Sequence, residues 1–233
     1  MVEAGRLTGE RWPVADGRSA DLAILVASDK RGIPGLYAVM LDQPGVQRER
    51  LQTIDPTRDY ARLRFEDAQA ERLGDAPFTS DDLRALRRQA SVPLAFEALG
   101  GAQACLDMSV EYAKFRYAFG RPIGSFQAVK HAAAQMLVAV ESSMSIVCYA
   151  AQSAEEGLPE RATHAAVAKA QVTRGSAEIA DSALTLHGAV GYTWEHDLQL
   201  FYKRAKLDRV LFGAPTAWND RIADSLPLLP ASA

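Results

Sequence analysis

The chain has 233 residues, a formal net charge of -3 and 24% charged residues. This length suffices for one large domain or two modest ones, and the slightly acidic balance disfavours nucleic acid as a partner. The only two cysteines, Cys105 and Cys148, lie among apolar helical residues, which predicts buried free thiols in a reducing, cytoplasmic setting. We see no apolar run of membrane-spanning length and no signal-peptide pattern, so we predict no membrane partner.

Short strands separated by turn residues are predicted from Leu7 to about Asp75. The segment 21–28 is a continuous apolar run suited to a buried strand, and a second run at 36–41 follows a turn rich in glycine and proline. Residues 62–65 alternate polar and apolar side chains, as a half-exposed strand does. Because these strands are too few for an independent barrel, we predict a partial antiparallel β-domain over residues 1–77.

The pattern becomes helical after Pro77. Thr79 and Asp82 have the spacing of a capping box, and apolar residues at helical spacing continue to about Arg116. Three further helices are expected, over residues 126–157, 159–187 and 198–211. Long helices joined by short loops predict an up-and-down four-helix bundle over residues 78–233. The predicted fold class is therefore mainly α, with the partial β-domain first.

A helical bundle raises the question of a metal centre, which would need paired histidines and carboxylates projecting inward. None of the four histidines pairs with a carboxylate or a second histidine at ligand spacing; they are His131, His164, His187 and His196. Serine or cysteine nucleophile elbows are also absent from the sequence. We predict no metal site.

Two stretches centred on glycine have more specific patterns. In residues 116–131 the Arg116 guanidinium could pair with a phosphate, Phe119 could cover an aromatic ring and Gln127 could hydrogen-bond it. A plain helix hairpin with incidental polar groups explains the same residues. In residues 184–195, glycines at a helix end would let a cofactor or another backbone approach closely, although a helix C-cap explains one of them equally well.

Together and in this order, the two stretches resemble the acyl-CoA dehydrogenase family. The pattern R-x-x-F-G-x-P-I-x-x-F-Q matches Arg116 to Gln127, and L-H-G-G-x-G-Y-T-x-E matches Leu186 to Glu195 with one change. Residues 7–12 and 20–21 look like the second half of the family's middle β-domain. The resemblance extends from Leu7 to about Ile222.

The resemblance implies a flavoprotein that binds FAD and removes hydrogens from the α and β carbons of an acyl-CoA. In the family, the FAD site is shared across a dimer, which implies a homo- or hetero-oligomer with another acyl-CoA dehydrogenase chain. The implied cofactor-binding positions are Arg116, Phe119, Gln127, Thr185, Gly188 and Ala189. Thr185 replaces a glutamine of the family and Ala189 replaces a glycine, and both changes would weaken the flavin contact.

The family's catalytic base has no counterpart by this resemblance. Most members carry a glutamate where this chain has Phe212, and a second group places the base on the first bundle helix, where this chain has Ala90. Neither side chain can accept a proton. Glu97, two turns after Ala90 on roughly the same helix face, is the one substitute that we can name.

Three functions are compatible with the sequence. The family's N-terminal helical domain and the first half of its β-domain have no counterpart before Leu7, so the chain could be a truncated but otherwise active dehydrogenase. It could be a subunit without a base that completes the FAD site of a competent partner. It could also be a flavin-free bundle that serves assembly. Arg116, Phe119 and Gln127 favour the second function over the third, and the missing bases favour it over the first.

Overall fold

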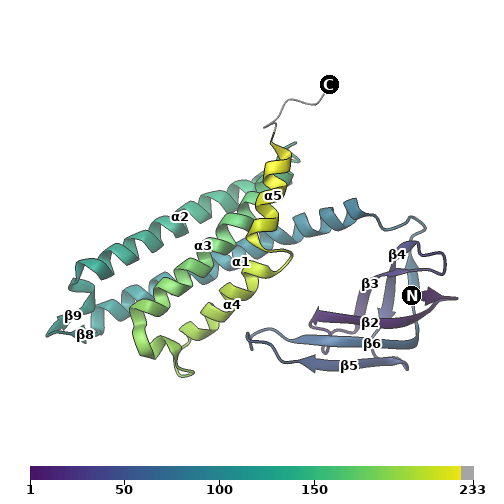
Figure 1. Cartoon of the computed structure of the whole chain (residues 1–233), viewed down its shortest axis with the longest axis horizontal. Coiled ribbons are helices and arrows are strands. Elements are labelled where there is room, and N and C mark those ends of the chain that lie inside the picture. Colours follow the sequence, from purple (N-terminus) through teal and green to yellow (C-terminus); the bar gives the residue numbers. More distant parts are fainter. Residues whose placement is uncertain (227–233) are drawn as a thin grey trace. The chain divides into compact units, whose positions relative to one another are not determined.

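The computed structural model describes residues 1–226 and divides the chain into two compact units (Figure 1). The first unit comprises residues 1–85 and the second begins at Leu86. The division falls inside the first long helix, α1 (Ser80–Phe115). Each unit has a hydrophobic core of its own.

The first unit contains seven strands in two antiparallel sheets. One sheet has the order β1-β2-β6-β5 and consists of β1 (Val2–Glu3), β2 (Arg6–Ala15), β6 (Tyr60–Gln69) and β5 (Val46–Leu51). The other has the order β3-β4-β7 and consists of β3 (Leu22–Ser28), β4 (Pro34–Met40) and β7 (Glu71–Leu73). The three strands predicted individually correspond to β3, β4 and β6, and the partial antiparallel β-region is confirmed.

The two sheets of the first unit share one core. On β3 and β4 alternate residues point inward and are buried, among them Leu25 and Val39, and they belong to the same cluster as Leu63 and Phe65 of β6. This is the period of two expected of a sheet with one face on a core. The opposite face of β3 leaves Ile24 62% exposed.

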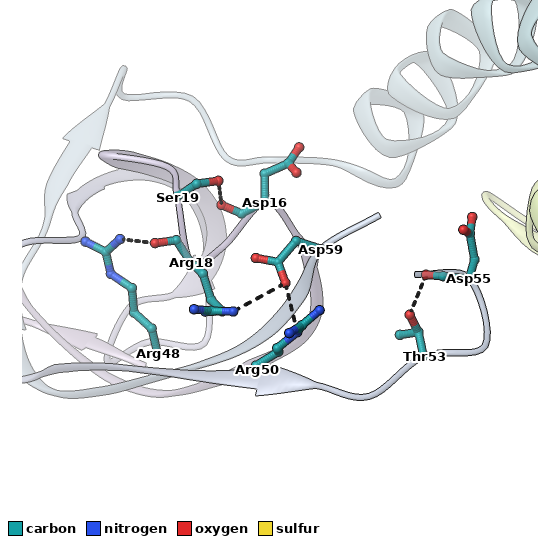
Figure 2. Close-up of polar contacts among 8 residues, drawn as sticks. All are labelled: Asp16, Arg18, Ser19, Arg48, Arg50, Thr53, Asp55 and Asp59. Atoms are coloured by element: carbon teal, nitrogen blue, oxygen red, sulfur yellow. Dashed lines mark hydrogen bonds and ion pairs between the residues drawn. The ribbon is translucent and has the colours of Figure 1, made fainter. Parts of the chain in front are cut away.

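A polar corner fixes the loops at one end of this unit (Figure 2). Asp59 forms ion pairs with Arg18 and Arg50, at 3.9 and 3.7 Å. The Arg48 guanidinium donates to the carbonyl oxygens of Arg18 and Ala20 at 2.8 and 3.0 Å. Backbone carbonyls of the loop before β3 are thus satisfied by one arginine side chain from β5, that of Arg48.

The second unit is helical and confirms the predicted mainly α fold. After α1 come α2 (Gln127–Glu155), α3 (Arg161–His187) and α4 (Leu198–Val210), close to the predicted ranges. A fifth helix, α5 (Pro215–Ser225), was not predicted; its Trp218 is buried against Ala166 and Ala170 of α3. The predicted capping box is present, since the Thr79 N–H donates to the Asp82 carboxylate at 2.8 Å and the Asp82 N–H donates to the Thr79 hydroxyl at 3.2 Å.

The core of the bundle consists mainly of small and aliphatic side chains from α1, α2, α3 and α4. Cys105 on α1 is buried there, and burial raises the pKa of its thiol to about 12. Cys148 on α2, by contrast, is exposed, so the expectation of two buried thiols is wrong for this residue. The reason is that α2 buries only a narrow stripe, whereas Cys148 lies outside it.

The helix α2 has an unusually apolar exposed surface. We define its outer face by four residues that are 47–65% exposed: Leu137, Val138, Met144 and Tyr149. Leu137 and Met144 were predicted to face the core, and the structure places them outside it. By length and composition alone α2 could cross a membrane, contrary to the sequence-based expectation, with 22% of its most apolar window buried. A helix that packs against a partner protein passes the same test, so this finding alone assigns no membrane role.

Candidate cofactor-binding end of the helical bundle

A strained two-residue turn presents Phe119 to solvent. The strands β8 (Tyr117–Ala118) and β9 (Arg121–Pro122) form a minimal hairpin after α1. Its loop residues Phe119 and Gly120 both have positive φ, 53° and 77°, as a type I′ turn requires. Glycine adopts this conformation at little cost, but a phenylalanine is strained in it. The Phe119 ring is 96% exposed, so burial does not compensate for the strain.

Arg116 lies at the neck of this hairpin. Its backbone N–H donates to Tyr112 at 2.9 Å, and its carbonyl accepts from Ile123 at 2.8 Å. The guanidinium is exposed and, among residues 1–226, carries no hydrogen bond or ion pair to another residue. The neighbouring Arg121 differs, because its guanidinium lies 4.2 Å from the Phe126 ring. Gln127, the first residue of α2, is also exposed.

The second stretch forms the C-terminal end of α3 and the short 3-10 helix η2 (Gly188–Tyr192) that follows. Gly188 has a φ of 63°, and its N–H donates back to Leu184 and Thr185, so it does cap the helix. The Thr185 hydroxyl donates to the Asp181 carbonyl at 2.9 Å, so this hydroxyl is hydrogen-bonded within its own helix. Gly188 and Ala189 are exposed.

The two stretches lie at the same end of the bundle, where α1 meets the β8–β9 hairpin and α3 finishes (Figure 1). The Tyr112 ring of α1 stacks on the His187 ring of α3 with 4.5 Å between centroids. Tyr112 lies one turn before Arg116, and His187 immediately precedes Gly188. The predicted cofactor-binding residues of both stretches therefore lie around one end of the bundle, where α1 and α3 finish.

The His187 imidazole that stacks on Tyr112 is buried and neutral. Its Nδ1 lies 2.8 Å from the Ala183 carbonyl, to which it donates. Burial lowers the pKa of His187, and the neighbouring His196 lowers it further against the effect of that hydrogen bond. His187 thus packs Tyr112 against α3. Among residues 1–226, no group of three or more His, Cys, Asp or Glu side chains is arranged to hold a metal ion.

The segment that contains Phe212 is held in place by a buried lysine. The Lys169 side chain of α3 is inaccessible to solvent and donates to the carbonyl oxygens of Asp208, Arg209 and Gly213 at 3.0–3.2 Å. These carbonyls lie at the end of α4 and in the turn to α5, where they have no helical partner. Within this turn Phe212 has a φ of 59° and is 46% exposed. Burial lowers the pKa of Lys169 to about 8, and the nearby Asp208 opposes the shift.

The Glu97 carboxylate forms an ion pair. Its carboxylate contacts the Arg204 guanidinium, which ties α1 to α4. This contact occupies the Glu97 carboxylate within the helical bundle. Ala90 lies partly buried on α1 and is not ionisable. Of the three positions singled out from the sequence, Phe212 and Ala90 therefore carry no ionisable group, and Glu97 is paired with Arg204.

Comparisons with known proteins establish the family. Residues 89–226 match the acyl-CoA dehydrogenase C-terminal domain. The chain is 38% identical over 163 residues to the acyl-CoA dehydrogenase IpdE2 of Mycobacterium tuberculosis, covering 70% of this chain and 46% of that protein. Butyryl-CoA dehydrogenase from Megasphaera elsdenii superposes with a TM-score of 0.86 at 26% identity, covering 94% of this chain and 60% of that one.

A third likeness is to a chain of the ChsE4-ChsE5 complex from Mycobacterium tuberculosis, with a TM-score of 0.83 and 28% identity over 97% of this chain and 61% of that one.

The family match and these relatives show that the 233-residue chain itself belongs to the acyl-CoA dehydrogenase family. It spans about half the length of the curated relatives that it matches. Members of the family are FAD-dependent flavoproteins.

The residues at this end of the bundle fit one part of FAD, the adenine dinucleotide half. The uncommitted Arg116 guanidinium suits a phosphate, and the exposed Phe119 ring suits a planar heterocycle. The Thr185 hydroxyl is already bonded within α3, and Ala189 adds an exposed methyl group next to Gly188. Sequence reasoning missed Tyr112 and Lys169, because neither lies in a motif and a lysine among alanines resembles an exposed helical residue.

Proposed function

We propose that this chain is a non-catalytic subunit that completes the FAD site of a competent acyl-CoA dehydrogenase chain. The observation that carries the proposal is the contrast between two regions. The turn that would hold the base is fixed by Lys169 but presents the phenyl ring of Phe212. Arg116 and Phe119, by contrast, are exposed, and the Arg116 guanidinium has no hydrogen bond or ion pair to another residue among residues 1–226. The chain would bind the cofactor with its partner and leave the proton transfer to that partner.

The outer face of α2 supports the presence of a partner. Large apolar side chains exposed together on one helix are typical of an interface between proteins. Leu137 also lines a hollow of about 440 Å³ between α1 and α2, which adjoins a second one of about 280 Å³ that reaches Pro122 and Gly124; the two share Val110 and Ala133. One of the solved relatives is itself part of a complex, ChsE4-ChsE5. We infer a heteromer with a homologous chain that acts on an acyl-CoA thioester.

The test is anaerobic flavin reduction by a panel of acyl-CoAs. When FAD bound to a dehydrogenase accepts hydride, its visible absorbance bleaches. We expect no measurable bleaching with this chain, FAD and acyl-CoA, because loss of a positioned base costs about two to four orders of magnitude in rate. We expect bleaching once a homologous chain that carries the base is added, and faster bleaching than that homologue gives alone.

Each other outcome assigns a different function. Fast bleaching by this chain alone would show an active dehydrogenase whose base lies elsewhere, and Glu97→Gln would then be the next variant. A chain that neither binds FAD nor alters a homologue's FAD binding would be a flavin-free scaffold. Both outcomes would overturn the proposed role.

A further inference from the structure

The helix α2 carries its terminal charges in the reverse of the usual order. Lys130 lies close to its start at Gln127, and Glu155 is its last residue. Because the positive end of the helix dipole is at the N-terminus, acidic residues stabilise a first turn and basic residues a last turn. The helix α1 follows this rule, with two aspartates in its first turn and a lysine in its last. Each end of α2 would therefore gain from an opposite charge outside the helix.

These terminal charges of α2 are unpaired within the part of the chain that the structure describes. Among residues 1–226, neither the Lys130 ammonium nor the Glu155 carboxylate has a hydrogen bond or ion pair to another residue. Glu156, which follows the helix, accepts a hydrogen bond from the neutral Gln152 side chain at 2.7 Å. One end of α2 is thus basic and the other acidic, and no cation or anion of this chain neutralises them.

A stripe of residues with heptad spacing joins the two charged ends. Along the outward side of α2, steps of four and three residues alternate from residue 130 to residue 155, and every member is exposed or partly buried. The buried residues of α2, which face the core of the bundle, form a separate stripe. Heptad spacing is typical of a helix that packs along a second helix. We call this set the outer stripe: Lys130, Ala134, Leu137, Glu141, Met144, Cys148, Ala151 and Glu155.

We propose that α2 pairs antiparallel with α2 of a second copy of this chain through the outer stripe, with the two-fold axis between residues 142 and 143. The alternation of four and three reads the same from either end of the stripe, so the two copies interlock in one register. A two-fold interface requires this kind of self-complementary surface. The members that lie opposite one another are Lys130 and Glu155, Ala134 and Ala151, Leu137 and Cys148, and Glu141 and Met144.

Charge complementarity identifies a second copy as the occupant of the outer stripe. The occupying helix must present an acid to Lys130 and a base to Glu155, and α2 turned end for end presents both. Between these ends the stripe is apolar apart from Glu141, and small residues allow two helices to approach closely. Ala134 and Leu137 also line the hollow of about 440 Å³ between α1 and α2, so the second helix lies beside apolar space that this chain leaves open.

Glu141 weakens the pairing and makes it reversible. The two Glu141 residues of a pair flank the two-fold axis, three residues or about 4.5 Å apart along the helices. A single polar residue in such a seam specifies the register at a cost in stability. The outer stripe also overlaps the outer face of α2, which the proposed function assigns to a homologous chain. The two assemblies therefore compete, and copies of this chain pair where the homologous chain is absent.

Disulfide trapping of the full chain tests the register. Leu137 faces Cys148 of the second copy, whereas the two Cys148 residues lie 11 residues, about 16 Å, apart along the helices, outside disulfide range. We expect oxidised Leu137→Cys protein to form a dimer through the introduced thiol and Cys148, in at least fivefold excess over wild type. Gln135→Cys is the matched control, because this exposed residue lies on the opposite flank of α2.

Two outcomes of the trapping experiment would overturn the proposal. One is a yield from Leu137→Cys no greater than that from Gln135→Cys. The other is efficient cross-linking of the wild-type chain through its own Cys148, which would indicate a parallel pair. Adding Cys148→Ser to Leu137→Cys should abolish the dimer, because two Leu137 positions are as far apart as two Cys148 residues.

Exchange of the terminal charges gives a second measurement, by sedimentation equilibrium of the full chain. Lys130→Glu and Glu155→Lys each place like charges at both ends of the pair and should weaken self-association at least fivefold. The double variant restores opposite charges and should return to within twofold of wild type. Glu141→Gln should tighten association several-fold, because it removes the like charges beside the two-fold axis.

The sedimentation results distinguish this inference from the proposed function. A double variant as weak as the single variants, or a wild-type chain that is monomeric at high micromolar concentration, would show that α2 does not pair with a second copy. Neither result bears on flavin bleaching in the mixture with a homologous chain. Conversely, a chain that pairs through the outer stripe but gives no bleaching in that mixture would overturn only the proposed role at the FAD site.

Discussion

Arg116 is the residue whose role at the FAD site can be tested most directly. Its guanidinium is exposed and uncommitted, so a phosphate contact is available to it. We expect Arg116→Ala to weaken FAD retention in the mixture with a competent homologue by roughly 1.5–3 kcal/mol, the range for a charge-assisted hydrogen bond. Equilibrium dialysis of FAD measures this change.

Arg121→Ala is the matched control for Arg116→Ala. Arg121 is also exposed but covers the Phe126 ring within its own chain. We expect little effect of this variant on FAD retention. Equal losses in the two variants would indicate a general effect of positive charge and would count against a specific contact at Arg116.

Phe119 combines strain with exposure, which is a pattern typical of functional positions. Asparagine tolerates the left-handed conformation better and precedes glycine in the preferred type I′ sequence. We therefore expect Phe119→Asn to raise the free energy of unfolding by about 1 kcal/mol while weakening FAD retention in the mixture.

Urea unfolding and FAD dialysis together measure the two effects of Phe119→Asn. Tyr117→Asn is the control, because Tyr117 is 62% exposed but not among the residues with positive φ. It should give no gain in stability. If Phe119→Asn were neutral for FAD, the strained ring would have no cofactor role.

At the scale of elements, Lys169 connects α3 to the α4–α5 turn, and its pKa has a measurable consequence. The folded pKa of about 8 lies below the ordinary value of 10.5. Between these two pH values the unfolded chain binds the proton more tightly, so stability should rise with pH across this window. We expect the wild-type chain to gain roughly 2–3 kcal/mol relative to Lys169→Met between pH 7 and pH 10.

Urea unfolding at the two pH values measures the Lys169 effect as a difference between variants. Lys114→Met serves as the control, because Lys114 is an exposed residue paired with Glu111 at 2.5 Å. Its difference from the wild type should stay constant with pH. A wild-type chain that loses stability relative to Lys169→Met as the pH rises would contradict the direction of the shift.

At the scale of the whole molecule, the outer face of α2 should govern assembly with the partner chain. Placing a charge in a buried apolar contact leaves it unpaired. We therefore expect Leu137→Lys to weaken association with a homologous chain at least tenfold, measured by size-exclusion chromatography with light scattering. Glu160→Lys, a charge change at an exposed residue outside α2, should have a much smaller effect. Unchanged assembly of Leu137→Lys would place the interface elsewhere.

Much of the architecture follows from local sequence patterns. Apolar spacing located α1, α2, α3 and α4 to within a few residues, because a helix that packs on one face repeats every three to four residues. The spacing did not reveal α5, which is short and buries a single large ring, Trp218. It also assigned Leu137 and Met144 to the core, since hydrophobicity alone does not distinguish a core from an interface with another protein.

Residue identity and local period were enough to predict the family resemblance, the helical bundle and the absence of a carboxylate at positions 90 and 212. The tertiary structure was needed to show which side chains are free and which are paired. It joined Glu97 to Arg204 across 107 positions of the chain and turned the Lys169 side chain onto three backbone carbonyls. It also left the Arg116 guanidinium without a partner among residues 1–226. Such pairings depend on which helix faces meet in space, and residue type and spacing do not specify them.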